Sequence, residues 1–439
     1  MILKEKLSQI IPEWRGRVSE LVKEHGEVEV DRVTISQIYG GMRNIKSLVT
    51  DISYVDAHEG IRLRGFTIPN LLKSLPKPKN GNVPLAGGLY YLLLVGEMPS
   101  HNEAMEVEDE WKNRAFIPEY VLDMLKAMPP TANPMTLFSQ AILGMQVESK
   151  FAKKLMTGIR KEDFWGLMLE DSLDLTARLP IIAAYIYNLK IREGQKPKPN
   201  QDLDWSANFG YMIGITDPAY YDLTRLYFII HSDHESGNVS AHTTHLVASS
   251  LADIYLATSA GMNGLAGPLH GRANQEVLKW LLDVKEHFQR VPSEEELHQY
   301  AWDSLNAGQL IPGYGHAVLR KTDPRYTVLH EFGMKHMPDD EIFQLADLVY
   351  KVVPQVLIEQ GKVKDPWPNV DAISGSLQYH FGIRDCDGYG ACDFYTVLFG
   401  VSRILGVTAN AVWARALNQP IERPKSMTTA MLEELTHKS

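Results

Sequence analysis

The sequence has almost no cysteine and no long apolar segment. Only Cys386 and Cys392 occur among 439 residues, and two thiols cannot form a disulfide framework, so we expect a reducing compartment. The longest unbroken apolar run, Leu89–Val95, is seven residues, far shorter than a membrane span. The N-terminal residues carry acidic side chains and no continuous apolar core, so we expect no targeting signal there.

Positive charge is also scarce. There are 44 Lys and Arg residues against 54 Asp and Glu, which gives a formal net charge of −10. We therefore expect neither nucleic acid nor an anionic membrane as a partner, and any bound phosphate must meet a local basic site. Internal repeats and long linkers are absent as well. The length predicts two or three domains, or one large and one small domain.

The periodicity of apolar residues is mainly helical. Asn133-Pro134 is typical of a helix start, and the apolar residues of 342–356 fall on one helical face. Strand-like alternation is confined to the segments 27–35 and 60–68. Pro180 is expected to break the apolar helix around it. The pattern predicts an all-α protein with a few short strands near the N-terminus.

Four of the fifteen histidines lie in one short window: His231, His234, His242 and His245. Each pair is spaced three residues apart, which places its members on one face of a helix. Three interpretations remain open from the residues alone. The histidines could chelate a metal, donate hydrogen bonds to an anion, or pack between helices. The window lacks a complementary Cys, Asp or Glu spacing, which weighs against zinc.

Three glycine- or proline-rich segments each present one residue that could act as an acid or a base. Residues 263–271 contain His270, and residues 310–326 contain His316. Glycines in such turns let the backbone approach a ligand closely. Residues 361–375 contain Asp371, and a carboxylate near histidines is a candidate general base. Taken singly, each residue could equally be an ordinary turn or cap residue.

Basic side chains cluster near these turns. Arg320, Lys321 and Arg325 follow His316 closely, and Lys362 and Lys364 precede Asp371. Arginines beside a glycine-rich turn suit carboxylate or phosphate groups. Near the C-terminus the candidates are Arg403 and Arg423. The competing interpretation of all these residues is a solvated basic surface.

Taken together and in order, these segments resemble the citrate synthase family, most closely its eukaryotic-type, dimeric branch. The resemblance covers nearly the whole chain and rests on YGGMRNIKSL, GIRLRGFTIP, HSDHESGNVSAHTTH, MNGLAGPLHGRANQEV, PGYGHAVLRKTDPRY, KDPWPNVDAISG, FGVSRILGV and RPKSM. It implies an all-α homodimer. The large domain would comprise 1–269 and 377–439 and the small domain 270–376, with the active site in the cleft between them.

The resemblance also implies a reaction, the condensation of acetyl-CoA with oxaloacetate and hydrolysis of citryl-CoA to citrate and CoA. Asp371 would remove a methyl proton from acetyl-CoA, and His270 would stabilise the enol or enolate. His316 would polarise the oxaloacetate carbonyl and protonate the new alkoxide. The family needs no metal or cofactor, since the CoA thioester is a substrate, and this favours an anion site for the histidine cluster.

The same resemblance assigns the substrate contacts. Oxaloacetate would be bound by His234, Arg325 and Arg403, with Arg423 reaching across from the partner subunit. CoA would be bound by the loop and basic residues Arg43, Lys161, Leu310, Ile311, Pro312, Gly313, Tyr314, Gly315, Arg320, Lys362 and Lys364.

Some positions depart from the family pattern. Ile373 stands where the family often has His, Ser236 stands where Gly is common, and the segment 384–393 is longer than expected. A 2-methylcitrate synthase using propionyl-CoA is the near alternative, because one methylene distinguishes acyl groups by only about 1–3 kcal/mol. A metal-dependent hydrolase and a catalytically inactive helical dimer are more distant ones. We expect a cytoplasmic, bacterial protein, or alternatively a mitochondrial matrix enzyme whose leader has been removed.

Overall fold

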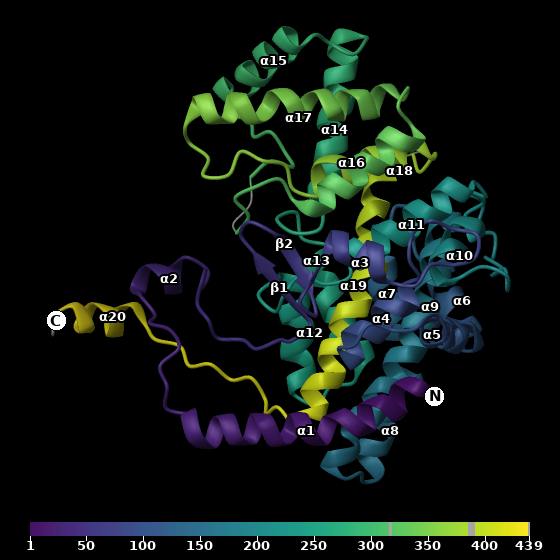
Figure 1. The fold of residues 1–439 in the computed structure, drawn as a ribbon, viewed down its shortest axis with the longest axis vertical. Coiled ribbons are helices and arrows are strands. Elements are labelled where there is room, and N and C mark those ends of the chain that lie inside the picture. Colours follow the sequence, from purple (N-terminus) through teal and green to yellow (C-terminus); the bar gives the residue numbers. More distant parts are fainter. Residues whose placement is uncertain (316–317, 385–390, 438–439) are drawn as a thin grey trace.

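The computed structural model describes residues 1–315, 318–384 and 391–437. Within them the chain forms twenty α-helices, two short 3-10 helices and one small sheet (Figure 1). The prediction of an all-α protein with a few N-terminal strands is confirmed. Two predicted features, His316 and Cys386, lie outside the described residues.

The sheet is a three-stranded antiparallel meander. Its strands are β1 (Ser53–Asp56), β2 (Gly60–Leu63) and β3 (Phe66–Thr67), in the order β1-β2-β3. The strand predicted within 60–68 is thus confirmed. The one predicted at 27–35 is wrong, since those residues have no neighbouring strand to accept their backbone hydrogen bonds and the helix α2 (Ile35–Tyr39) begins there.

Two long helices run through the core, α9 (Phe164–Ile191) and α19 (Ala391–Ala416) (Figure 1). By length and composition α19 could cross a membrane, but 94% of its apolar window is buried inside the protein, which identifies it as a core helix. The predicted break at Pro180 is wrong, because α9 continues through it. Proline leaves the carbonyl four residues earlier without a helical donor, and here the Trp205 indole donates to that Thr176 oxygen at 2.9 Å.

The remaining helices of the body surround this pair. The predicted start of α7 at Pro134 is confirmed, with Asn133 Oδ1 accepting the Met135 N–H at 2.8 Å. The helices and short 3-10 turns are α1 (Ile2–His25), α3 (Ile68–Ser74), α4 (Ala86–Val95), α5 (His101–Arg114), α6 (Glu119–Lys126), α7 (Pro134–Gly144), η1 (Met145–Glu148), α8 (Lys150–Thr157), η2 (Lys161–Asp163), α10 (Trp205–Met212), α11 (Pro218–Ile230), α12 (Val239–Ser249) and α13 (Ile254–Leu265).

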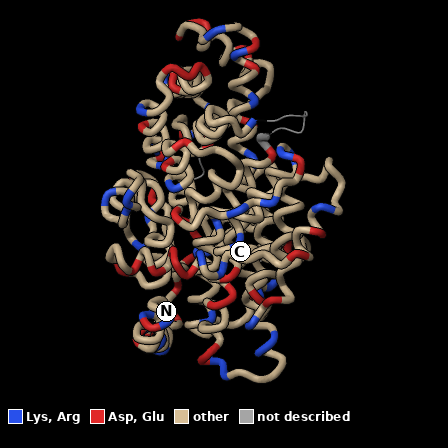
Figure 2. The backbone as a smooth tube through the Cα atoms, turned by 90° about the vertical axis from the view of Figure 1, so that its right-hand side faces the viewer, with Lys and Arg blue, Asp and Glu red and all other residues tan. Residues whose placement is uncertain are grey.

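Five helices pack on one another at one end of the molecule, at the top of Figure 1. In the sequence, all five lie between the turn of His270 and the start of α19. They are α14 (Ala273–Phe288), α15 (Glu294–Asn306), α16 (Pro324–His336), α17 (Glu341–Gln360) and α18 (Asp371–His380). The predicted small domain, 270–376, covers most of this group. Figure 2 shows basic and acidic residues interspersed along most of the chain.

Both ends of the chain contribute to an arm that projects from the body. It comprises the end of α1, α2, the C-terminal tail and α20 (Thr429–Thr436) (Figure 1). Tyr39 and Thr429 join its two halves through a hydrogen bond of 2.7 Å between their side-chain oxygens.

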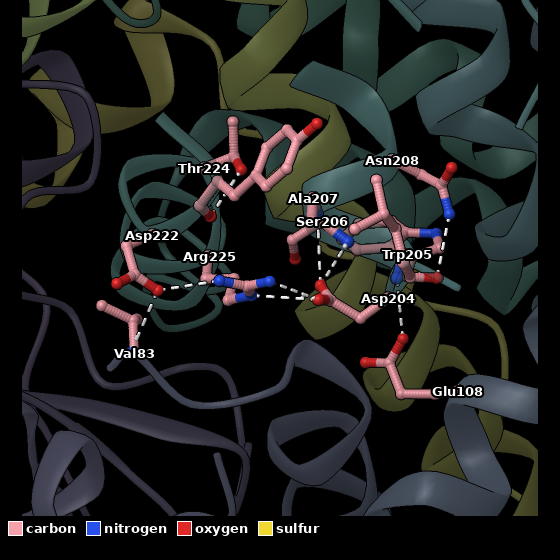
Figure 3. A network of polar contacts seen from close by, with 12 residues as sticks. Val83, Glu108, Asp204, Trp205, Ser206, Ala207, Asn208, Asp222, Thr224 and Arg225 are labelled. Atoms are coloured by element: carbon pink, nitrogen blue, oxygen red, sulfur yellow. Dashed lines mark hydrogen bonds and ion pairs between the residues drawn. The ribbon is translucent and has the colours of Figure 1, made fainter. Parts of the chain in front are cut away.

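A buried polar network ties four helices of the body together (Figure 3). Glu108 of α5 accepts the backbone N–H groups of Gly87 and Trp205, each at 2.8 Å, at the starts of α4 and α10. Burial, reinforced by the nearby Asp204, raises the pKa of Glu108 to about 8. Arg225 lies between Asp204 and Asp222, with its nitrogens 2.7 Å from each carboxylate. One guanidinium therefore compensates two buried carboxylates.

We expect Arg225→Met to destabilise the fold by about 3–5 kcal/mol, because it leaves Asp204 and Asp222 buried without their cation. Thermal or urea unfolding measures the loss. Arg32→Met is the matched control, since its ion pair with Glu29 is exposed, and it should change stability little. An equal effect of the two substitutions would contradict the role assigned to Arg225.

Candidate active site

Two loops meet in front of α18 and place its first residue. Gly315 N–H donates to the Trp367 carbonyl at 3.2 Å, and Asn369 N–H donates to the Gly313 carbonyl at 2.9 Å. Gly313 has φ +82°, and a Cβ there would lie 2.8 Å from the Ala372 Cα, so only glycine fits. The loop that leads to the predicted His316 therefore packs directly on the start of the helix that carries Asp371.

Asp371 is a carboxylate with an elevated proton affinity. It is the first residue of α18, and its N–H donates to Asn369 Oδ1 at 3.0 Å. Burial raises the pKa of Asp371 to about 6, with Asp323 adding to the rise and Arg325 and Arg403 opposing it. It is therefore charged at neutral pH but more basic than an ordinary aspartate, which suits a general base.

His270 is a neutral hydrogen-bond donor whose tautomer follows from its contacts. It lies in the turn between α13 and α14, where the Gly271 N–H donates to the Leu265 carbonyl at 3.0 Å. The Ser240 N–H donates to His270 Nε2 at 3.3 Å, so the proton of the neutral ring is on Nδ1. Burial and the charge of Arg403 lower the pKa of His270 to about 4. The ring thus offers an Nδ1–H without being a strong acid.

Two buried arginines complete the described part of the site. Arg403 of α19 is fully buried; its Nη1 donates to Asn238 Oδ1 at 3.1 Å and its Nε to the His231 carbonyl at 3.3 Å. Burial lowers the pKa of Arg403 to about 10, so it remains a cation at neutral pH. Arg325 of α16 is held by both oxygens of Asp323, which lie at 2.7 and 3.1 Å. Both cations lower the pKa of Asp371, so they lie close enough to its carboxylate to act on it electrostatically.

The histidine cluster divides between two places. His231 is buried, with its Nδ1 2.9 Å from the Tyr227 carbonyl, and burial lowers its pKa to about 3. His234 lies three residues further along the chain and is half-buried. His242 and His245 instead face the C-terminal tail, where they contact Glu422. In the described part of the chain, no three His, Cys, Asp or Glu side chains converge to hold a metal ion.

Several predicted substrate residues are placed apart from this centre. Arg43 follows α2 on the projecting arm, Lys161 begins η2, and Arg423 is exposed on the C-terminal tail beyond the far end of α19 (Figure 1). Lys362 and Lys364 are exposed. They lie beside the loop of residues 310–315, because the neighbouring Val363 and Asp365 pack on Gly315. Arg320 is exposed as well, and its N–H donates to the Ala57 carbonyl at the turn between β1 and β2.

Three residues around the arginines were not predicted as site residues. They are Asn238, which orients Arg403, Asp323, which orients Arg325, and Asp233, which accepts the Ser53 hydroxyl at 2.6 Å. Asp323 could have been found, because an Asp-Pro pair at a helix start predicts an N-cap two residues before Arg325. Asn238 also lies at a helix start, but its contact with Arg403 joins distant parts of the chain.

Comparison with known proteins agrees with this arrangement. The family described as citrate synthase, C-terminal domain, matches residues 41–425. A probable mitochondrial citrate synthase of Glossina morsitans morsitans is 52% identical over 437 residues, covering 99% of this chain and 93% of that protein.

The chain belongs to the citrate synthase family.

Solved structures of citrate synthases share its fold. The enzyme of Pyrobaculum aerophilum superposes with a TM-score of 0.78 at 26% identity, over 92% of this chain and 97% of that one. Citrate synthase of Thermoplasma acidophilum, in a ternary complex with carboxymethyl coenzyme A and oxaloacetate, gives a TM-score of 0.73 at 19% identity, over 91% of this chain and 97% of that one. The resemblance predicted from the motifs is therefore confirmed.

One prediction is wrong, the cytoplasmic and bacterial location. The relative that is 52% identical over nearly the whole chain is a probable mitochondrial citrate synthase, which contradicts that location. The expectation had rested on the N-terminal residues alone, and these do not determine the compartment. Composition and charge did not separate the two compartments, since both are reducing.

Proposed function

We propose that the protein condenses acetyl-CoA with oxaloacetate and hydrolyses the resulting citryl-CoA to citrate and CoA. The observation that supports this most directly is the pairing of a neutral Nδ1–H donor, His270, with a carboxylate of raised pKa, Asp371, beside two buried arginines. Its 52% identity to a citrate synthase agrees. Thiol release from acetyl-CoA that depends on oxaloacetate, measured beside propionyl-CoA, tests both the reaction and the acyl preference.

The chemistry assigned to each residue follows from its protonation. Asp371 takes a proton from the methyl group of acetyl-CoA, and the electron pair of that C–H bond moves toward the thioester oxygen. His270 Nδ1–H donates to this oxygen as its negative charge develops. The enol carbon then forms the new bond to the ketone carbon of oxaloacetate. The proton for the resulting alkoxide is assigned to His316, and water hydrolyses the thioester of citryl-CoA.

Oxaloacetate brings two carboxylates, which Arg325, Arg403 and His234 are proposed to bind. The planar guanidinium group suits a carboxylate better than an ammonium group does. Arg423 lies on the exposed tail of its own chain, so we assign it to the partner subunit's site. The exposed Leu310 and the basic residues Arg320, Lys362 and Lys364 are proposed to bind CoA, with Ile311, Pro312, Gly313, Tyr314 and Gly315 forming the loop around it. Arg43 and Lys161 would reach that CoA only from the partner subunit.

A homodimer is supported by apolar side chains that one chain leaves exposed. On the packed layer of α7, α12 and α13 with η1, they are Leu143, Val147, Val239, Leu246 and Leu256, each between 39% and 58% exposed. The projecting arm adds Val28, Val30, Ile35, Ile421, Met431 and Leu435. Apolar surface of this extent is typical of a protein–protein interface. No cofactor is proposed, and we propose that the 270–376 domain closes over oxaloacetate.

We expect kcat/KM for acetyl-CoA to fall about tenfold per pH unit below the pKa of Asp371, about 6. Above that pH the carboxylate is charged and can accept the methyl proton, and below it the group is already protonated. A steady-state pH profile measures this. Asp371→Asn is the control and should lose turnover at every pH while still binding oxaloacetate. A profile that stays flat well below pH 6 would contradict the base role.

We expect His270→Asn to retain more activity than His270→Gln. The Asn amide nitrogen lies near the position of Nδ1, whereas the Gln amide nitrogen lies near that of Nε2, which here accepts the Ser240 N–H. Loss of the donor should lower kcat by about 10²–10³-fold. The thiol-release rate measures both variants, and greater activity of the Gln variant would reverse the assigned tautomer.

Mixing Arg423→Ala chains with Asp371→Asn chains should restore activity that neither homodimer has. In the hybrid, one site combines an intact Asp371 with an intact Arg423 from the other chain. Random exchange gives hybrids in about half of the dimers, so about a quarter of wild-type activity is expected. If Arg423 served the site of its own chain, mixing would restore nothing.

A further inference from the structure

The C-terminal tail is fastened to α12 immediately before Arg423. Glu422 Oε1 lies 2.9 Å from His242 Nε2, and its Oε2 lies 4.0 Å from His245 Nε2. The backbone N–H of Glu422 donates to Ser249 Oγ at 3.1 Å. The side chain and backbone of Glu422 are thus hydrogen-bonded to His242 and Ser249, and His245 lies beside them on the same face of α12. We name His242, His245 and Glu422 the tail clamp.

The tail clamp is partly shielded from water. The side chains of His242, His245 and Glu422 are only 29%, 20% and 23% exposed, whereas the next residue, Arg423, is exposed. Pro424 follows and restricts the backbone of Arg423 further. The chain therefore has a fixed point at Glu422 and a cation projecting from it.

The helix that carries the clamp also touches the active site of its own chain. At its start the Ser240 N–H donates to His270 Nε2, and Asn238 Oδ1 accepts from Arg403. The same short helix, Val239–Ser249, therefore holds one active site at its first turn and the tail at its second and third. This gives the tail a rigid reference within the molecule.

We propose that Glu422 is a positioning residue: held by His242 and Ser249, with His245 alongside, it fixes where Arg423 leaves the surface and thereby sets the oxaloacetate affinity of the partner subunit's site. This rests on the proposed function and on the assignment of Arg423 across the interface. A fixed tail has already lost the conformational freedom that a loose one would lose on binding. Binding of oxaloacetate should therefore weaken when the clamp is removed.

The first test is a kinetic one on the full-length enzyme. Glu422→Ala should raise KM for oxaloacetate about tenfold, equivalent to about 1.4 kcal/mol, while KM for acetyl-CoA and kcat change less than about twofold. Glu422→Gln keeps an oxygen that can accept from His242 and should restore most of the affinity. His242→Ala, which breaks the clamp from the helix side, should behave as Glu422→Ala does.

The matched control is Glu359→Ala. It breaks a similar pair, His298 Nε2 to Glu359 Oε2 at 3.1 Å, between α15 and α17. It should leave KM for oxaloacetate unchanged. Equal rises in both KM values, or a fall in kcat alone, would indicate a general structural effect of Glu422 and overturn its positioning role.

The decisive test uses hybrid dimers with a single working site. Chains carrying Asp371→Asn together with Glu422→Ala are mixed with Arg423→Ala chains, so the only intact Asp371 receives its Arg423 from an unclamped tail. KM for oxaloacetate should rise. With Glu422→Ala placed on the Arg423→Ala chain instead, KM should remain that of the parent hybrid, and a rise there would overturn the proposal.

The outcomes separate this inference from the proposed function. If the wild-type enzyme showed no oxaloacetate-dependent thiol release, the proposed function itself would be wrong. Parent hybrids without activity would remove the assignment of Arg423 to the partner, and with it the role of the tail clamp, but not the proposed function. If the wild-type and parent hybrid enzymes were active but Glu422→Ala left KM for oxaloacetate unchanged, only the positioning role of the tail clamp would be wrong.

Discussion

The active site depends on keeping two guanidinium cations inside a helical core. Arg403 is fully buried on α19 and Arg325 nearly so on α16. A buried cation is costly unless it is paired and hydrogen-bonded, and here each arginine has its own hydrogen-bond partners. Arg325 has the two oxygens of Asp323, while Arg403 has the oxygens of Asn238 and His231. These partners come from loops and helix ends that must all meet at one place, and the surrounding fold holds them there.

The same burial sets the protonation of the acid–base pair. Removal from water disfavours the charged form of either group, so it lowers the pKa of His270 and raises that of Asp371. The two pKa values shift in opposite directions, and near neutral pH the site then holds an uncharged donor and a charged base. Arg403 reinforces the first shift, and Arg325 and Arg403 moderate the second. One physical cause, desolvation beside fixed cations, thus prepares both roles.

Two surface features of the single chain suggest that it has a partner. Apolar side chains lie exposed on α7, α12, α13 and the projecting arm, and the tail bearing Arg423 lies away from its own site. In the proposed homodimer, a second copy would cover these apolar side chains and receive Arg423 in its own site. The proposed link through α12 would then connect the geometry of one active site to the tail that reaches the other.

The sequence by itself determined the fold class and the family, because helical periodicity and ordered motifs are local in the chain; the roles of the site residues stay predictions. It correctly began α7 at Pro134 and found the strand at 60–63. It failed where distant residues decide: Pro180 stays within α9 because Trp205 satisfies the freed carbonyl, and 27–35 is not a strand because no partner strand lies beside it. The tertiary structure alone decided the His270 tautomer, the raised pKa of Asp371 and the division of the histidine cluster. Each of these results from a contact or a loss of water that only packing between remote segments creates.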